Sequence, residues 1–98
     1  MIERIFKYTA NKYELASNEG AFALDMPAGA RVILAGQQHG EFCVWAIVDP
    51  DRVPERREFL LRGTGHPLPT NVVHIGSFLQ NEGEFVWHLF APKDDPNA

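Results

Sequence analysis

The residues best suited to binding chemistry form one short irregular run, Arg62-Gly63-Thr64-Gly65-His66-Pro67. The two glycines allow the backbone to turn sharply, and the N–H groups of such a turn can surround an anion. The side chains of Arg62, Thr64 and His66 could donate further hydrogen bonds to the same anion. The run therefore predicts a binding loop for a small anionic ligand. The alternative is a rigid connection between strands, in which the glycines serve backbone geometry alone, because a single Gly-x-Gly is a common pattern.

Two tryptophans could add an aromatic surface to such a site. Trp45 lies in the run 42–48 and Trp87 in the run 85–90, where His88 follows it directly. Both runs are apolar on both faces, which is typical of strands that pack between layers or at an oligomer interface. Core packing is one interpretation of the two indoles. The other places an indole on a pocket wall, where it stacks on a nucleotide base, with His88 beside it.

Catalytic and metal-binding signatures do not occur in the sequence. The four histidines, at positions 39, 66, 74 and 88, lack the spacing of a zinc site, so we expect no metal. A nucleophile would have to be Cys43, Ser17, Ser77 or a threonine beside a general base, and no motif of known nucleophiles surrounds any of them. We therefore expect a non-enzymatic protein without a cofactor, in which Cys43 fills the core.

The charged residues indicate which kinds of partner the protein could bind. The formal net charge is −4, so the surface should repel phosphate backbones, and generic nucleic-acid binding is disfavoured. Residues 49–57 contain two prolines and charges of both signs, which predicts an exposed, solvated loop. Its carboxylates could contact a basic site on a partner protein, and the candidates for that role are Asp49, Asp51 and Glu55.

The elements that position these residues should be strands. Alternation and β-branched or aromatic enrichment predict strands at residues 2–8, 21–26, 31–37, 41–48, 57–62, 72–79 and 84–90. Short glycine-containing links predict two hairpins, one over residues 31–48 and one over residues 72–90. Residues 11–20 are compatible with a turn of helix or a short strand. The pattern predicts an all-β protein with little helix: a small antiparallel sandwich or barrel of about six or seven strands.

Length and composition predict one β domain over residues 1–91 and a disordered tail over residues 92–98. One cysteine, no secretory signal and no long apolar run favour the cytoplasm and argue against a membrane protein. Strands that are apolar on both faces need more cover than a chain of 98 residues supplies, so we expect a homo-oligomer.

Four blocks of the sequence resemble a family of short phage- and prophage-encoded proteins of unknown function. They lie at residues 44–50, 62–67, 74–78 and 85–90, and the most specific are Gly-Thr-Gly-His-Pro and Phe-Val-Trp-His. The resemblance implies a phage accessory protein in the cytoplasm of a bacterial host. It implies no activity and no catalytic residues.

These observations combine into one leading hypothesis: a non-enzymatic phage counter-defence protein that binds and sequesters a small, nucleotide-like anion. A second hypothesis is an inhibitor that binds a host protein, such as a defence nuclease or effector, through its acidic surface. A third is a small enzyme or a virion component.

Overall fold

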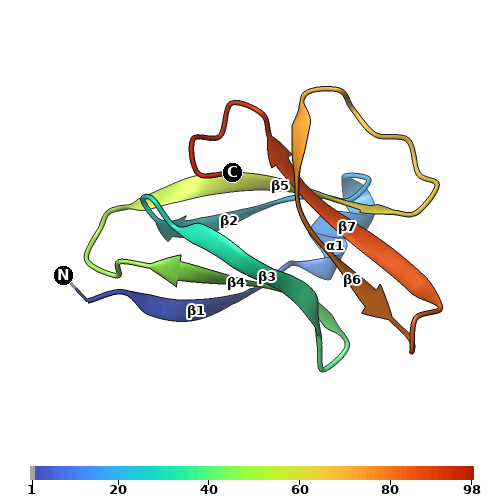
Figure 1. Ribbon diagram of the computed structural model, residues 1–98, viewed down its shortest axis with the longest axis horizontal. Coiled ribbons are helices and arrows are strands. Elements are labelled where there is room, and N and C mark those ends of the chain that lie inside the picture. Colours follow the sequence, from blue (N-terminus) through green and yellow to red (C-terminus); the bar gives the residue numbers. More distant parts are fainter. Residues whose placement is uncertain (1) are drawn as a thin grey trace.

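Two antiparallel sheets pack face to face in the computed structural model, which describes residues 2–98 (Figure 1). The first sheet has the order β1-β4-β3, with bounds Arg4–Thr9, Glu41–Val48 and Arg31–Gln38. The second has the order β2-β5-β7-β6, with bounds Ala21–Pro27, Pro54–Gly63, Phe85–Pro92 and Val72–Gln80. The seven strands confirm the all-β prediction. Because the two sheets are separate, the architecture is a sandwich and not a closed barrel.

Alternation along the central strands builds the core. Val44, Ala46 and Val48 of β4 are buried on the inner face of the first sheet. Leu61 of β5 and Leu89 of β7 are buried on the inner face of the second. Successive side chains of a strand point to opposite faces, so each of these strands contributes every second residue to one shared apolar layer.

Both predicted hairpins are present. β3 and β4 are joined at His39 and Gly40, whose φ angles are 53° and 78°. β6 and β7 are joined through Asn81, Glu82 and Gly83, which also have positive φ. Such left-handed residues give a tight turn the twist that an antiparallel pair requires, and they are the reason that both links contain glycine and the second also contains asparagine.

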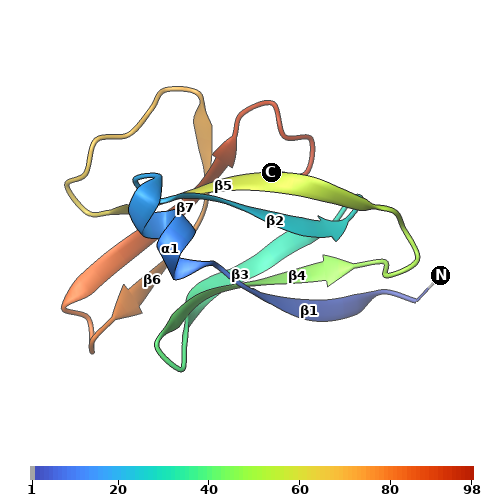
Figure 2. The ribbon, with the colours of Figure 1, turned by 180° about the vertical axis from the view of Figure 1, so that it is seen from behind.

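The segment for which the sequence allowed helix or strand is the helix α1 (Lys12–Ser17). The Asn11 side chain caps it, because Asn11 Oδ1 accepts from the backbone N–H groups of Tyr13 at 2.9 Å and Glu14 at 3.1 Å. Gly20 then returns the chain to the sheet with φ of 90°, against the Leu61 carbonyl, where a side chain would not fit. α1 therefore lies across one end of the sandwich (Figure 2).

The sequence predicts one exposed loop over residues 49–57, but in the structure only part of this segment is a loop. β5 already begins at Pro54 and pairs with β2, with Arg57 opposite Leu24. Arg57 is only 4% exposed: its Nε donates to Asp95 at 3.0 Å and its Nη1 to the Ala30 carbonyl at 2.7 Å. The prediction of a solvated Arg57 is wrong because its partner lies 38 residues away in the sequence.

The C-terminal segment, for which we predicted disorder, contributes that partner. The Asp95 carboxylate lies against Arg57, and the Lys93 N–H donates to the Asn71 carbonyl at 2.9 Å. These two contacts connect residues 93–95 to the second sheet. Among residues 2–98, no helix has the length and apolar character that crossing a bilayer requires.

Candidate functional site

A cavity of about 560 Å³ lies at the α1 end of the sandwich. We call it the Trp87 cavity. Its walls come from α1 and the turn after it, from the first residues of β4, and from the connection between β5 and β6. They are lined by Lys12, Leu15, Ala16, Glu19, Gly20, Phe42, Leu61, Arg62, His66, Pro67 and Trp87. Three residues of the predicted ligand site, Arg62, His66 and Trp87, therefore meet in one cavity.

The indole of Trp87 is held on three sides. Its Nε1 donates to Gln80 Oε1 at 2.6 Å, and its ring meets the Phe42 ring edge to face with centroids 5.5 Å apart. The His66 ring stands edge-on to it at 6.2 Å. Because the ring is already fixed, a ligand that packs against it gains apolar contact while the side chain loses little further conformational entropy.

Positive charge borders the same cavity. The Arg62 guanidinium donates from Nε to the Pro67 carbonyl at 2.9 Å and from Nη1 to the Glu19 carbonyl. Both acceptors are neutral, and Arg62 forms no ion pair with a carboxylate among residues 2–98. No ion pair therefore neutralises Arg62 at the rim, which also carries Glu19 and Lys12, whose Nζ lies 5.4 Å from the centre of the Tyr13 ring.

The backbone of the glycine loop does not face outward as predicted. The Gly63 N–H donates to His66 Nδ1 at 3.1 Å, the Thr64 N–H to the Val86 carbonyl at 3.2 Å, and the His66 N–H to the Gly63 carbonyl at 3.1 Å. Gly63 is needed because the His66 ring folds back on it, so that an added Cβ would lie 3.0 Å from that ring. Gly65, with φ of 90°, makes the turn. The prediction that this loop forms a cradle of free amides is wrong at these three N–H groups, because internal acceptors occupy them.

Two other predicted site residues lie elsewhere. Trp45 points to the outer face of the first sheet, where its ring covers Gly36. His88 points to the outer face of the second sheet, since its neighbour Trp87 points inward. Gly63 and Thr64 border a smaller cavity of about 340 Å³ that Trp87 also lines.

The outer face of the second sheet carries a hydrogen-bonded array that the sequence analysis did not assemble. Ser77 Oγ lies 2.7 Å from His88 Nδ1 and 2.9 Å from His74 Nε2. His88 Nε2 lies 3.0 Å from Thr64 Oγ1. We call these four residues the Ser77 array.

A β-bulge makes this array possible. Residues three apart in a regular strand point to opposite faces, so His74 and Ser77 would be separated by the sheet. The register of β6 against β7 shifts between His74 and Gly76, so Ile75 has no partner across the ladder. The extra residue turns His74 and Ser77 to the same face. The isolated Gly76 inside a strand pattern was the one sequence signal that could have indicated the bulge.

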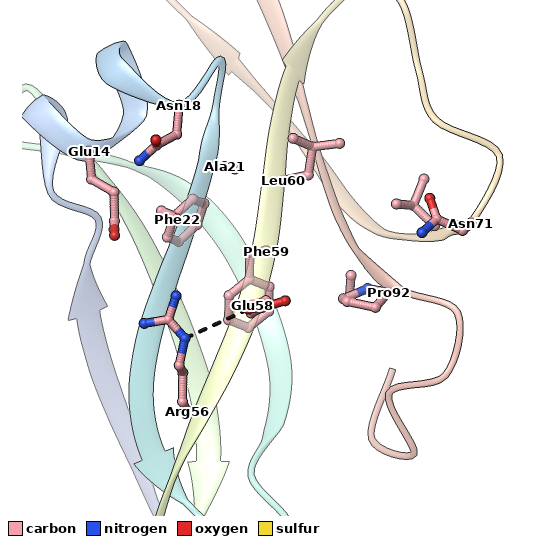
Figure 3. Close-up of a pocket in the computed structure, with 12 residues that line it drawn as sticks. Glu14, Asn18, Ala21, Phe22, Arg56, Glu58, Phe59, Leu60, Asn71 and Pro92 are labelled. Carbon is pink, nitrogen blue, oxygen red and sulfur yellow. Dashed lines mark ion pairs between the residues drawn. The ribbon is translucent and has the colours of Figure 1, made fainter.

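A groove of about 400 Å³ lies beside the strands β2, β5 and β7 (Figure 3). The buried rings of Phe22 and Phe59 form part of its wall and stack with centroids 5.5 Å apart. Arg56 and Glu58 form an exposed ion pair at 3.7 Å along one side, and Leu60 and Pro92 line the other. We call it the β5 groove.

The acidic residues proposed as a partner site lie at the end of the sandwich away from α1 (Figure 1). Asp49 Oδ1 accepts from the Asp51 N–H at 3.1 Å, and Glu55 Oε1 from the Gly29 N–H at 3.4 Å. Two of the three carboxylates thus support local turns, and Asp51 is exposed. Within residues 2–98, no three histidine, cysteine, aspartate or glutamate side chains gather in a way that could hold a metal ion.

These features define a two-sheet antiparallel sandwich with a largely apolar cavity at one end and a polar array on the outside of one sheet. The chain belongs to the family described as a domain of unknown function, DUF7352, whose model matches residues 1–98. No curated protein and no solved structure matches it.

Proposed function

We propose that this protein binds a small, anionic, nucleotide-like ligand in the Trp87 cavity. The observation that carries the proposal is the meeting of a fixed indole with two cationic side chains, Lys12 and Arg62, around one largely apolar space. Such a site suits a ligand with a flat apolar part and a negatively charged part.

The dimensions fit that ligand class. Small-molecule sites have volumes of about 300–1,000 Å³, and the cavity measures about 560 Å³. A base or similar ring would lie against Trp87, where stacking contributes about 1–3 kcal/mol. The anionic group would lie at the rim, held by the side chains of Lys12, Arg62 and His66 in place of the loop amides that the sequence suggested.

The sequence resemblance to phage-encoded proteins supports a biological setting. In that setting the protein would act in the cytoplasm of a bacterial host, where sequestering a nucleotide-like signal counteracts defence. Binding alone suffices for this role, and it requires no cofactor.

Calorimetry with cyclic nucleotides and ADP-ribose-type nucleotides tests the proposal. We expect one ligand class to release heat, Trp87→Phe to weaken binding, and Lys12→Met to weaken it with a shallower dependence on salt. Trp45→Phe is the matched control, because Trp45 lies on the other sheet. Absence of heat with every nucleotide, or equal losses in the two tryptophan variants, would contradict the proposal.

A second candidate is inhibition of a host protein through residues 49–55. The observation that favours it is the exposed tip of this loop, where Val53 is 74% exposed and Asp51, two residues before it, is exposed as well. An apolar side chain beside a carboxylate suits a basic partner surface. Asp51→Lys should abolish retention of such a partner and leave nucleotide binding unchanged, whereas loss of both would contradict a separate protein site.

Self-association is also part of the proposal. The outer face of the first sheet is uncovered and carries Ile5, Leu34, Trp45 and Ile47, with Ile5 and Leu34 more than half exposed. Arg31 pairs with Ile47 at one end of this face and Lys7 with Trp45 further along, so a polar rim borders the apolar centre. Light scattering should give a mass above 11.0 kDa, and Leu34→Lys should return it to the monomer value. A wild-type monomer would contradict this part.

A further inference from the structure

We propose that Ser77 is a nucleophile, activated by His88, that accepts acyl groups from small esters. This activity goes beyond ligand binding and would replace the sequence-based expectation of a non-enzymatic protein. It lies on the outer face of the second sheet, whereas the Trp87 cavity lies at the inner face.

The geometry is that of a nucleophile, a base and a residue that orients the base. Ser77 Oγ and His88 Nδ1 are 2.7 Å apart, which is within the range for proton transfer. His88 Nε2 and Thr64 Oγ1 are 3.0 Å apart, so a hydroxyl occupies the place where a carboxylate often orients the histidine.

An arrangement of hydrogens that satisfies every contact of the array leaves His88 Nδ1 free to accept. Thr64 Oγ1 lies 3.4 Å from the Val86 carbonyl, an acceptor to which the threonine hydroxyl can donate. It then accepts from His88 Nε2–H, and the neutral imidazole presents the lone pair of Nδ1 to Ser77. Ser77 donates to this lone pair and accepts from His74 Nε2–H. In this arrangement His88 has the tautomer that a general base requires.

The reaction follows from that arrangement. Ser77 Oγ attacks the ester carbonyl carbon as its proton passes to His88 Nδ1. The tetrahedral adduct collapses, the bond to the leaving oxygen breaks, and the proton on His88 passes to the departing alcohol. Water then attacks the acyl-serine, gives its proton to His88, and the serine recovers that proton as the carboxylic acid leaves. Each proton is returned, and no oxidant or cofactor enters.

The sheet register indicates where the acyl group would lie. Ser77 pairs with His88, which pairs on its other side with Arg62, and the next row on the same face is His74, Phe90 and Leu60. The His74 and Phe90 rings meet edge to face at 5.5 Å. Phe90 and Leu60 are apolar, and Leu60 also lines the β5 groove, so an apolar strip leads from the His74 end of the array into that groove. The substrate class is therefore an ester with a short apolar acyl chain.

The test is acylation of the full chain by p-nitrophenyl butyrate. We expect a burst of p-nitrophenolate and an added butyryl mass on the peptide that contains Ser77. Ser77→Ala should abolish both, and His88→Ala should slow the burst by about 100-fold or more, the usual contribution of a general base. Ser17→Ala is the matched control, because Ser17 is an exposed serine of α1 outside the array.

Two further measurements separate catalysis from structure. Added imidazole should restore acylation in His88→Ala, which a purely structural role of His88 would not allow. Leu60→Trp should shift the preference from butyrate towards acetate, because the larger side chain fills the start of the groove. A butyryl mass on other residues at equal rates, or a burst unchanged in His88→Ala, would overturn the proposal. Nucleotide binding, measured separately by calorimetry, would stand or fall independently.

Discussion

The two faces of β7 differ in their chemistry. Trp87 points inward, is held by Gln80 and Phe42, and borders a cavity with cationic side chains at its rim. His88 points outward, is half-buried, and joins a polar array. One peptide bond separates them. Two neighbouring residues can thus serve two sites because a strand sends consecutive side chains to opposite faces.

The connection between β5 and β6 contributes one residue to the surroundings of each face of β7. His66 lines the Trp87 cavity and Thr64 contacts His88. Residues of one sequence motif therefore lie at two different candidate sites. A motif that is continuous in the sequence need not form a continuous site.

The largest expected effect compares how much residues on the two faces contribute to the free energy of unfolding. Leu89 is 1% exposed on the inner face, so Leu89→Ala should lower the free energy of unfolding by about 2–5 kcal/mol. His88→Ala, next to it on the outer face, should change that free energy by less than about 0.5 kcal/mol. Urea denaturation measures both. Comparable losses would show that the outer array is part of the fold and not an addition to it.

The next effect makes the same comparison on β5. Arg57 and Asp95 form a buried ion pair, whereas Arg56 and Glu58 form an exposed one. Asp95→Ala should cost about 3 kcal/mol because it leaves a buried charge unpaired, and Glu58→Gln should cost less than about 1 kcal/mol. Denaturation midpoints report the difference. A negligible loss in Asp95→Ala would mean that the C-terminal segment does not hold this contact in solution.

A smaller effect concerns the loop that the faces share. Thr64→Val removes the acceptor for His88 Nε2–H while keeping the side-chain shape. We expect acylation of Ser77 to slow by about 2- to 10-fold, the equivalent of one hydrogen bond, with nucleotide affinity unchanged. Stopped-flow kinetics and calorimetry give the two values, and Thr70→Val is the control, because Thr70 is exposed in the same connection and lies outside the array. A parallel loss of nucleotide affinity would join the two sites into one.

The smallest effect concerns Trp45, which the sequence assigned to the same site as Trp87. Because its ring lies over Gly36 on the outer face of the first sheet, Trp45→Phe should change neither acylation nor nucleotide affinity. The fluorescence change on ligand addition should persist in this variant and disappear in Trp87→Phe. The reverse result would restore Trp45 to the ligand site.

Much of the fold could be predicted because its signals are local. Strand alternation, the turn residues at Gly40 and Gly83, and the absence of an amphipathic helix depend on neighbours within a few positions. The partner of Arg57 could not be predicted, because an ion pair across 38 residues leaves no local trace. The contact with Asp95, which only the folded chain brings about, buries Arg57 and shields it from solvent.

For the candidate sites, the sequence by itself determined the residue types: a glycine loop with Arg62 and His66, an indole at position 87, and a serine at position 77 that lacked a visible base. Only the tertiary structure decided their groupings. Internal acceptors occupy loop amides that we predicted to be free for an anion, and one extra residue in β6 brings His74, Ser77 and His88 to one face. The physical reason is that residue chemistry belongs to single positions, whereas side-chain direction and hydrogen-bond partners depend on the register of strands distant in the sequence.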